Sequence, residues 1–407
     1  MQGAIIKRAF IVMSNAVTMQ TTSVQRALEV VEIAKPLQLN LNRPIPIPSP
    51  QQILIKVLVV GLNPHDAKSL SRGLFLTPPF TEHSVLPAVL GNDVVGRIVS
   101  IGDAVRTPSP LSIGDIVVTQ ADLRHNISAG GVTSPQNGLQ EHAVVDPEFT
   151  ALVPPGLPDG LDAMAAVPTN AIASLFALFA PPMNGVGGLD IPAPWMRGVS
   201  TEWKQKVDHF DYAGTTVLVV GGGSNCGRWA VQLLRLAGIG KIVVVGGDEK
   251  ELKALGATVV ISRHGTESEV LQRAQEATGD RLLYAFDAVN PPSGQLLAAR
   301  ALSKNAHGTL SRLVRNPPLD LKEQVTDKMA GFDVVNVMGG SQLNPEIAVP
   351  FWERLEGWMS NGDLKSTPYV RQSIGADWSD AANKVNNLLN QYDEGAWVVK
   401  THFHFIE

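Results

Sequence analysis

The pattern of apolar and polar positions is typical of β-strands in the first part of the chain and becomes helical near residue 160. From about residue 25 to 150, short β-branched runs alternate with proline and glycine, which predicts short strands and turns. The runs are "RALEVVEIA", "QILIKVLVVGLNP", "VVGRIVSIG" and "IGDIVVTQA". Gly91, Gly96 and Gly102 stand where such strands would bend tightly. We therefore expect a small, distorted β-barrel in this part of the chain.

A helical period begins at "GLDAMAAVPTNAIASLFALF", residues 160–179, and Pro168 interrupts it. The next stretch, residues 181–213, is polar and contains several prolines. A connection of this length is either a surface excursion or a functional segment.

From Thr215 onward, strand and helix patterns alternate. The apolar run "TVLVVG" precedes a helix expected at 225–237, and the runs that follow are "KIVVVGG", "ATVVIS", "LLYAFDAV", "GTLSRLV" and "FDVVNVMGG". Such alternation predicts βαβ units and a doubly wound parallel sheet with helices on both faces. Amphipathic helices are expected at 350–364 and 378–395. The terminal strand pattern "WVVKTHFHF" is expected to rejoin the first sheet.

These patterns divide the chain into an extension and two domains, because 407 residues exceed one ordinary core. Residues 1–24 are expected to be an N-terminal extension. The first domain takes residues 25–175 and is completed by 345–407. The second takes residues 176–344 and carries the insert 181–213.

Composition and charge exclude several classes of partner. The net charge is −5, with Lys and Arg scattered, so nothing favours nucleic acid or an anionic membrane surface. No apolar run reaches the roughly 18 residues of a membrane helix. Cys226 is the single cysteine of the chain, which suits a reducing compartment, and we expect a cytoplasmic protein.

The loop "GGGSNCG" after the run "TVLVV" has the features of a phosphate-binding turn. Gly221 ends the strand, and Gly222 and Gly223 permit a positive φ. Ser224 and Asn225 fall at the helix N-cap. A glycine at 227 would let the helix pack closely against the strand. A strand–turn–helix without a ligand is the alternative, and the βαβ series that follows favours nucleotide binding.

Six segments in order resemble the medium-chain dehydrogenase/reductase superfamily, in its zinc-free quinone and enoyl reductase branch. They are "GLNPHDAK", "LGNDVVGRIVSIG", "GDIVV", "NGLQEHAVVD", "AAVPTNAIASLFAL" and "FWERLEGWMSNGDLK", and the loop "GGGSNCG" has the superfamily's Gly-x(5)-Gly spacing. The resemblance spans about residues 25–403 and is nearest to fungal trans-acting enoyl reductases and their toxin-biosynthesis relatives. It implies a GroES-like distorted β-barrel catalytic domain beside a Rossmann domain.

The resemblance also bears on zinc. Asn63 stands where zinc-dependent relatives have a cysteine, and Asn92 where they have the histidine of a "GHE" motif. Because a catalytic zinc needs about three protein ligands, we expect no metal. The histidines near these segments are then expected to be surface or internally satisfied side chains: His65, His83, His125 and His142.

By the same resemblance, Asn63 lies beside a nicotinamide, Lys68 acts near it as an electrostatic or proton-relay group, and Thr169 meets the nicotinamide amide. Ordinary roles remain open for them: Asn63 can start a turn, and Lys68 can be solvated. Asp66 can be a helix cap. The implied cofactor contacts are Asn63, Gly221, Gly222, Ser224, Asn225, Cys226, Gly227, Lys250, Val289, Asn290 and Gly339. Cys226 is expected to serve packing rather than redox chemistry.

The cofactor's identity depends on "GGDEK", after the second strand. Asp248 could bind a ribose 2′-hydroxyl, as in NADH enzymes, and Lys250 could bind the 2′-phosphate of NADPH. The resemblance favours NADPH. The chain is shorter here than its relatives, and "GAWVV" replaces their C-terminal "G-K-x-V", which puts the adenosine site in doubt.

The expected function is zinc-independent, NADPH-dependent reduction of an activated C=C bond in an enoyl or enone substrate. The substrate is expected to be a small molecule or carrier-bound, with a polyketide synthase as partner in fungal secondary metabolism. An NADPH quinone oxidoreductase is one alternative, and a non-catalytic relative that kept the fold is another. The sequence leaves open a monomer or a homodimer.

Overall fold

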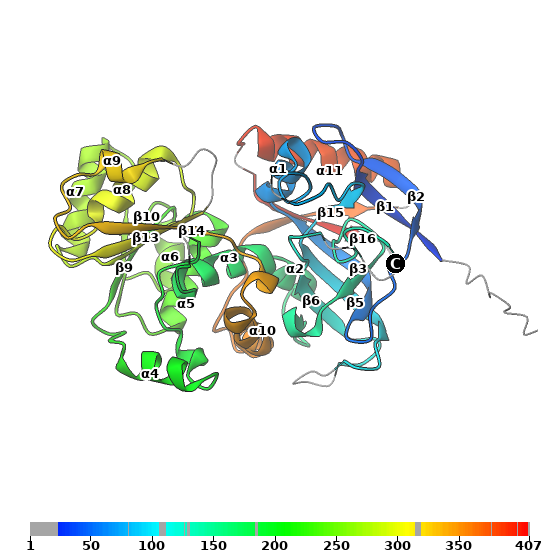
Figure 1. Ribbon diagram of the computed structural model, residues 1–407, viewed down its shortest axis with the longest axis horizontal. Coiled ribbons are helices and arrows are strands. Elements are labelled where there is room, and N and C mark those ends of the chain that lie inside the picture. Colours follow the sequence, from blue (N-terminus) through cyan, green and yellow to red (C-terminus); the bar gives the residue numbers. More distant parts are fainter. Residues whose placement is uncertain are drawn as a thin grey trace, which may run out of the picture.

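The chain forms two lobes, each built on its own sheet, and helices α3 (Pro168–Phe179) and α10 (Pro345–Ser360) lie between them (Figure 1). The computed structural model describes residues 23–79, 81–105, 111–125, 127, 131–183, 186–313, 319–375, 377–396 and 398–405. The expected N-terminal extension, residues 1–24, lies outside the described residues except for its last two.

The first lobe is built on a seven-stranded sheet in the order β15-β16-β3-β5-β6-β8, with β7 also paired to β3. A smaller sheet has the order β2-β1-β4. The register between β3 and β5 shifts twice, and such bulges bend a sheet. The strands are β1 Val24–Val30, β2 Gln38–Pro44, β3 Ile53–Leu62, β4 Ala88–Val89, β5 Asp93–Ile101, β6 Ile116–Gln120, β7 His142–Val145, β8 Thr150–Leu152, β15 Tyr369–Ile374 and β16 Lys400–Phe405. The distorted β structure expected for this part is confirmed.

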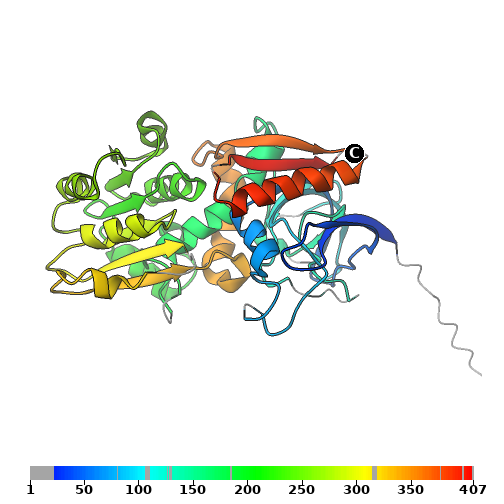
Figure 2. The ribbon, with the colours of Figure 1, turned by 90° about the horizontal axis from the view of Figure 1, so that it is seen from above.

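The terminal strand β16 rejoins this sheet as expected. It runs antiparallel to β3 and parallel to β15. Helix α11 (Trp378–Asp393) packs beside α1 (Pro64–Arg72), and Figure 2 shows the red helix lying next to the blue one. Segments more than 300 residues apart thus share one core.

The second lobe is an all-parallel sheet in the order β11-β10-β9-β12-β13-β14. This is the doubly wound order, and the expected parallel sheet is confirmed. The strands are β9 Thr216–Val220, β10 Lys241–Val245, β11 Val259–Ile261, β12 Tyr284–Asp287, β13 Gly308–Leu313 and β14 Phe332–Val337.

Side chains along β9 alternate between the two faces of this sheet. Val217 and Val219 pack in the core shared with α3 and α5, whereas Leu218 and Val220 pack with α7 and α8. The helices are α5 Asn225–Leu236, α6 Glu249–Leu255, α7 Glu267–Thr278, α8 Pro292–Ala301 and α9 Leu321–Gln324. Helices therefore cover both faces, as expected.

Two local expectations were wrong. The positive φ of the glycine loop falls on Gly221, at 87°, rather than on Gly222 or Gly223. Helix α10 begins at Pro345, five residues before the expected start, and Pro350 lies inside it. The break at Pro168 is confirmed, because α2 (Gly160–Ala165) ends just before it and α3 begins at it.

The insert 181–213 contains a 3₁₀ turn at Pro194–Met196 and helix α4 (Thr201–His209). Although the segment is polar in sequence, Met196 is fully buried and Trp203 almost so. The Trp203 indole Nε1 donates to Glu346 of α10 at 2.7 Å. The insert is thus anchored to the helix between the lobes. Across the described residues, no helix has the length and apolar character needed to cross a bilayer.

Candidate functional site

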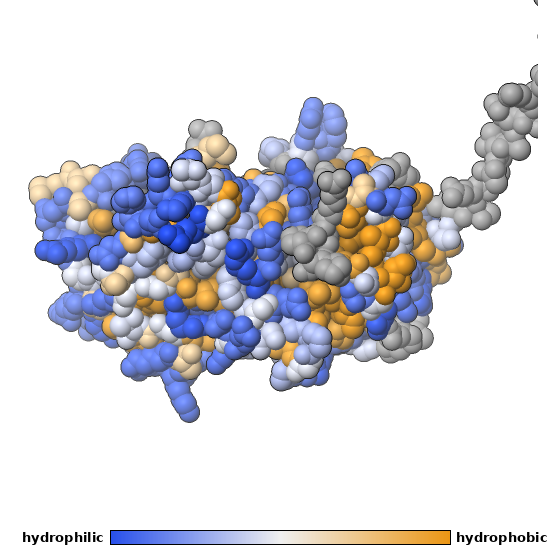
Figure 3. Space-filling view, turned by 90° about the horizontal axis from the view of Figure 1, so that it is seen from below, coloured by the Kyte–Doolittle hydropathy of each residue, from blue (hydrophilic) through white to orange (hydrophobic). Residues whose placement is uncertain are grey.

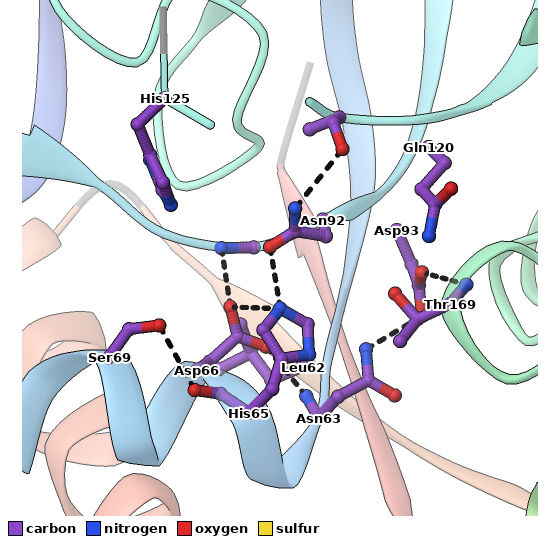
Figure 4. Close-up of polar contacts among 12 residues, drawn as sticks. Leu62, Asn63, His65, Asp66, Ser69, Asn92, Asp93, Gln120, His125 and Thr169 are labelled. Atoms are coloured by element: carbon purple, nitrogen blue, oxygen red, sulfur yellow. Dashed lines mark hydrogen bonds and ion pairs between the residues drawn. The ribbon is translucent and has the colours of Figure 1, made fainter. Parts of the chain in front are cut away.

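Asn63 stands where β3 ends and α1 begins. Its backbone is extended, and Pro64 occupies the first helical position, where a missing N–H does no harm. The backbone N–H of Asn63 donates to Asp66 Oδ2 at 2.8 Å, and Gly91 N–H donates to Asp66 Oδ1 at 2.9 Å. Asp66 is thus the cap that the sequence allowed, and it fixes where the Asn63 side chain points (Figure 4).

The Asn63 carboxamide is the centre of a buried hydrogen-bond network. Its Nδ2 donates to Asp93 Oδ2 at 2.9 Å. Its Oδ1 accepts from Asn170 Nδ2 and from Lys400 Nζ, each at 2.9 Å. Asn63 is only 3% exposed. The residue expected to lie beside the nicotinamide therefore joins the first lobe to helix α3.

Lys400 and Asp93 form an ion pair inside this network, with side chains 1% and 0% exposed. Burial alone would raise the pKa of the Asp93 carboxyl. The Lys400 charge and hydrogen bonds from Asn63, Lys400 and Thr169 outweigh it and hold that pKa below its usual range. Asp93 is therefore a carboxylate, and the network keeps one positive and one negative charge.

Thr169 lies at the start of α3, where the sequence placed it. Its backbone N–H donates to Asp93 Oδ1 at 2.7 Å, so the structure brings Thr169 and Asn63 together through one carboxylate (Figure 4). The Thr169 hydroxyl is buried and has no hydrogen-bond partner within the described residues. An orphaned buried hydroxyl is costly, and a ligand amide would satisfy it.

The network continues into the glycine loop of the second lobe. Cys226 Sγ lies 3.5 Å from Asn170 Oδ1, and Ser174 Oγ donates to the Cys226 carbonyl at 2.8 Å. Burial raises the pKa of the Cys226 thiol to about 12. The thiol is therefore protonated at neutral pH, which agrees with a packing role.

The glycine loop is a close-packed cradle at the N-terminus of α5. A Cβ at Gly222 would lie 2.2 Å from Val244 Cγ1, and one at Gly227 would lie 2.3 Å from the Gly221 carbonyl. Ser224 is the N-cap, and its Oγ accepts from Gly227 N–H at 3.0 Å. The remaining first-turn N–H groups, including that of Asn225, have no acceptor within a helix. This geometry suits a pyrophosphate.

The two candidates for cofactor choice lie at the start of α6, on the surface. Asp248 is its N-cap and accepts from Glu251 N–H at 2.7 Å, whereas the Lys250 side chain is exposed. Arg263 lies beside Gly246, with carbon atoms 3.5 to 3.8 Å from where a Cβ at Gly246 would be. Lys250 and Arg263 thus lie near this turn, and Asp248 caps the helix that follows it.

Val289 and Asn290 follow β12 and lie over the glycine loop. A Cβ at Gly221 would lie 2.3 Å from Val289 Cγ2. Asn290 N–H donates to Asp287 Oδ1 at 2.7 Å, and its side chain donates to the Leu313 carbonyl. Burial raises the pKa of Asp287 to about 6.

Gly339 follows β14 and lies at the junction of the lobes. Its carbonyl accepts from Gln120 Nε2 at 2.8 Å, and a Cβ on it would lie 2.6 Å from Ala173 Cα. Gln120 Oε1 also accepts from Ser341 N–H at 2.9 Å. One β6 side chain thus holds the loop after β14 against the first lobe.

A second polar cluster adjoins Asn63 and includes His65 and His125, for which no role in the site is expected from the sequence. His65 Nε2 lies 2.7 Å from Asn92 Oδ1. His125 is 2% exposed, and burial lowers its pKa to about 3, so its imidazole is neutral. Lys68 is half-buried, one helical turn beyond His65 on α1.

Three members of the site escaped the sequence reasoning: Asp93, Asn170 and Lys400. A detectable signal existed for one of them. Lys400 interrupts the apolar strand pattern "WVVKTHFHF", and a lysine in a buried strand requires a nearby carboxylate. Asp93 lies 307 positions earlier, and no local pattern connects the two.

Metal ligands are not gathered at this site. Throughout the described ranges, no three His, Cys, Asp or Glu side chains lie together as metal ligands. Asn63 and Asn92, which stand where the sequence resemblance places the zinc ligands of other enzymes, carry carboxamides, and both carboxamides make hydrogen bonds.

A bent β domain facing a parallel sheet with a glycine loop defines the class, an oxidoreductase with an NAD(P)-binding fold. Two family models match the chain: Alcohol dehydrogenase GroES-like domain over residues 49–156, and Zinc-binding dehydrogenase over residues 226–313. The chain belongs to the medium-chain dehydrogenase/reductase superfamily.

Several of the curated relatives are named trans-enoyl reductases. A trans-enoyl reductase of Cordyceps militaris is 30% identical over 354 residues, which cover 82% of this chain and 86% of that protein. A trans-enoyl reductase of Pyricularia oryzae is 29% identical over 290 residues, covering 71% and 70%. Among solved structures, the CurK enoyl reductase has a TM-score of 0.67 at 17% identity, covering 94% of this chain and all of that one, a likeness of fold.

Proposed function

We propose that this protein is a zinc-independent, NADPH-dependent reductase of an activated C=C bond in an enoyl or enone substrate. The observation that carries the proposal is the Lys400 ammonium, which donates to Asn63 Oδ1 and to Asp93. Zinc-dependent relatives have a thiolate where Asn63 stands. A fixed cation beside that position, together with neutral carboxamides, disfavours a divalent metal.

Without a Lewis acid, hydride delivery to an electron-poor alkene is the reaction that this architecture suits. When bound, the cofactor would supply the hydride, and the protein supplies position and electrostatics. The residues fit such a group: the glycine loop would hold the pyrophosphate, and the orphaned Thr169 hydroxyl would receive the nicotinamide amide. Asn63 would orient the nicotinamide from the side of the first lobe.

Selection of NADPH is proposed from the charges at the turn after β10. Lys250 and Arg263 are both exposed there, and a 2′-phosphate would lie between two cations. Asp248 is the cap of α6, where its Oδ1 accepts from Glu251 N–H.

The proposed substrate is a small-molecule or carrier-bound enoyl group, and this reductase would act on it in trans as the partner of a polyketide synthase. The enoyl class of substrate is supported by the curated relatives named trans-enoyl reductases. The insert 181–213 is the proposed docking segment. A groove of about 530 Å³ runs between it and α10, and its lining includes Trp195, Val199, Val349 and Arg354.

The test is a two-stage assay. NADPH should quench or shift protein fluorescence in a saturable way, and hydride transfer should follow with a panel of enoyl thioesters, enones and quinones. A metal chelator should leave the rate unchanged. Turnover of quinones alone would favour the quinone reductase alternative, and neither binding nor turnover would favour the non-catalytic one.

A further inference from the structure

We infer that His65 is the catalytic acid of this reductase and delivers the proton that follows the hydride. The inference rests on the proposed function. When the β-carbon accepts hydride, the π electrons of the double bond move onto the α-carbon and carbonyl oxygen. The enolate formed in this way needs one proton, and the two electrons of the reduction come from the cofactor. His65 lies two residues beyond Asn63, on the first turn of α1.

Hydrogen bonding fixes which ring nitrogen of His65 is free. Asn92 Nδ2 donates to the Ala121 carbonyl at 3.2 Å, so the other end of that carboxamide, Oδ1, faces His65 Nε2 at 2.7 Å. Nε2 must therefore carry a hydrogen and donate it. Nδ1 has no hydrogen-bond partner among the residues that the structure describes, which leaves it for a substrate.

A buried carboxylate lies beside the ring. Asp66 Oδ1 lies 3.7 Å from His65 Nε2, and the Asp66 side chain is fully buried. Two backbone N–H groups, those of Asn63 and Gly91, hold this carboxylate in place. With Nε2 donating to Asn92, the ring can donate from Nδ1 only as imidazolium. Two other titratable groups lie nearby: His125, whose imidazole is neutral, and Lys68, one helical turn further along α1.

His65 is more exposed to solvent than its polar neighbours. Its side chain is 18% exposed, whereas Asn92, Asp93 and His125 are each buried. Figure 4 shows the His65 ring between Asn92 and the pair formed by Asn63 and Thr169. The ring is thus held at Nε2 by Asn92 and is partly exposed to solvent. After the proton leaves Nδ1 for the α-carbon, the neutral ring takes another from solvent.

The decisive experiment reads which face of the substrate is protonated. An α-methyl enoyl thioester gives a product with a stereocentre at the carbon that takes the proton. The native enzyme should give one configuration. His65→Gln keeps a donor for Asn92 but cannot transfer a proton, so kcat should fall about 100-fold or more and both configurations should form from protonation by water. NADPH binding should be unchanged.

Lys68→Met and His83→Gln serve as comparisons, because Lys68 is the rival donor and His83 lies exposed on the surface. A single product configuration from His65→Gln would overturn the inference, as would mixed configurations from Lys68→Met alone. If the native protein neither binds NADPH nor reduces any enoyl substrate, the proposed function itself fails instead.

A measurement without turnover completes the test. Nuclear magnetic resonance of protein labelled with ¹⁵N-histidine reports the tautomer of each ring. The resonances lost in His65→Gln should show hydrogen on Nε2 and an unprotonated Nδ1 at alkaline pH. A ring with hydrogen on Nδ1 would contradict the assignment whatever the activity of the variant.

Discussion

Lys400 Nζ donates a 2.9 Å hydrogen bond to Asn63 Oδ1, so the last strand of the chain holds the residue that begins α1. The same ammonium pairs with Asp93, and both charges are almost completely buried. The site is therefore positioned by a contact between distant ends of the chain.

Removing this cation should destabilise the protein strongly. Lys400→Met leaves the Asp93 carboxylate buried and unpaired, and we expect a loss of about 3–5 kcal/mol in the free energy of unfolding, measured with urea. The double variant Lys400→Met/Asp93→Asn should recover at least about 1 kcal/mol of this loss, because no charge then remains buried. If the losses in free energy of unfolding from the two single variants simply added up in the double variant, the proposed coupling of Lys400 and Asp93 would be contradicted.

Asp287→Asn should make the protein more stable at alkaline pH. Burial raises the pKa of this carboxyl to about 6, above its unfolded value. The native state therefore binds the proton more tightly, and stability falls as pH rises through that value. We expect the variant to gain about 1–3 kcal/mol at pH 8, with the gain vanishing towards pH 4. Urea titrations of both proteins across this range provide the measurement, and a constant difference at all pH values would contradict the prediction.

Lys250→Ala and Arg263→Ala should each weaken NADPH binding about tenfold, or about 1.4 kcal/mol, and leave NADH binding unchanged. Fluorescence titration at fixed ionic strength measures both. Lys253→Ala is the matched control, because Lys253 lies on the same helix and pairs with Glu249 at 2.7 Å. Equal losses for NADPH and NADH would show that the two cations do not read the 2′-phosphate.

Trp203→Ala should release the insert from α10. The indole is 4% exposed and bonded to Glu346, and we expect a loss of about 3–5 kcal/mol together with rapid proteolysis within 181–213. Trp203→Phe keeps most of the packing and loses only the hydrogen bond, for about 1 kcal/mol. Glu202→Ala, on the exposed side of α4, should change little.

Gly222→Ala should abolish NADPH binding, because its new Cβ would lie 2.2 Å from Val244 Cγ1 and must displace the loop. Gly198→Ala is the control, since no atom lies within 4 Å of a Cβ there. Isothermal titration of the folded variants gives the comparison. Normal binding by Gly222→Ala would mean that the loop tolerates a shift without losing its ligand.

Local patterns predicted the elements and the two kinds of domain, because each strand or helix reveals its buried face in its own sequence. These patterns gave wrong positions where more than one residue could serve the same local role, such as starting a helix or adopting a positive φ. The sequence predicts a helix that starts at Pro350, since proline favours the first helical position, but the helix starts at Pro345 and continues through Pro350. The glycine loop was recognised, although Gly221 rather than its neighbours has the positive φ.

The site was predicted less completely, for a physical reason. Asn63 and Thr169 belong to recognisable segments, but what joins them is a carboxylate and an ammonium from strands far apart in the sequence. Such pairing depends on tertiary packing rather than on spacing along the chain. The same applies to Gln120, which reaches the loop at Gly339 from the other lobe.

The return of β16 to β3 also determines the order in which the protein can form on the ribosome. Strands β9 to β14 and their helices come from one continuous stretch, residues 216–337, so this lobe can close while translation continues. The first lobe cannot, because one edge of β3 stays bare and Asp93 lacks its counter-charge until residues 400–405 emerge. The first lobe is therefore completed after the second, and until then its unpaired strand edge is open to association with other chains.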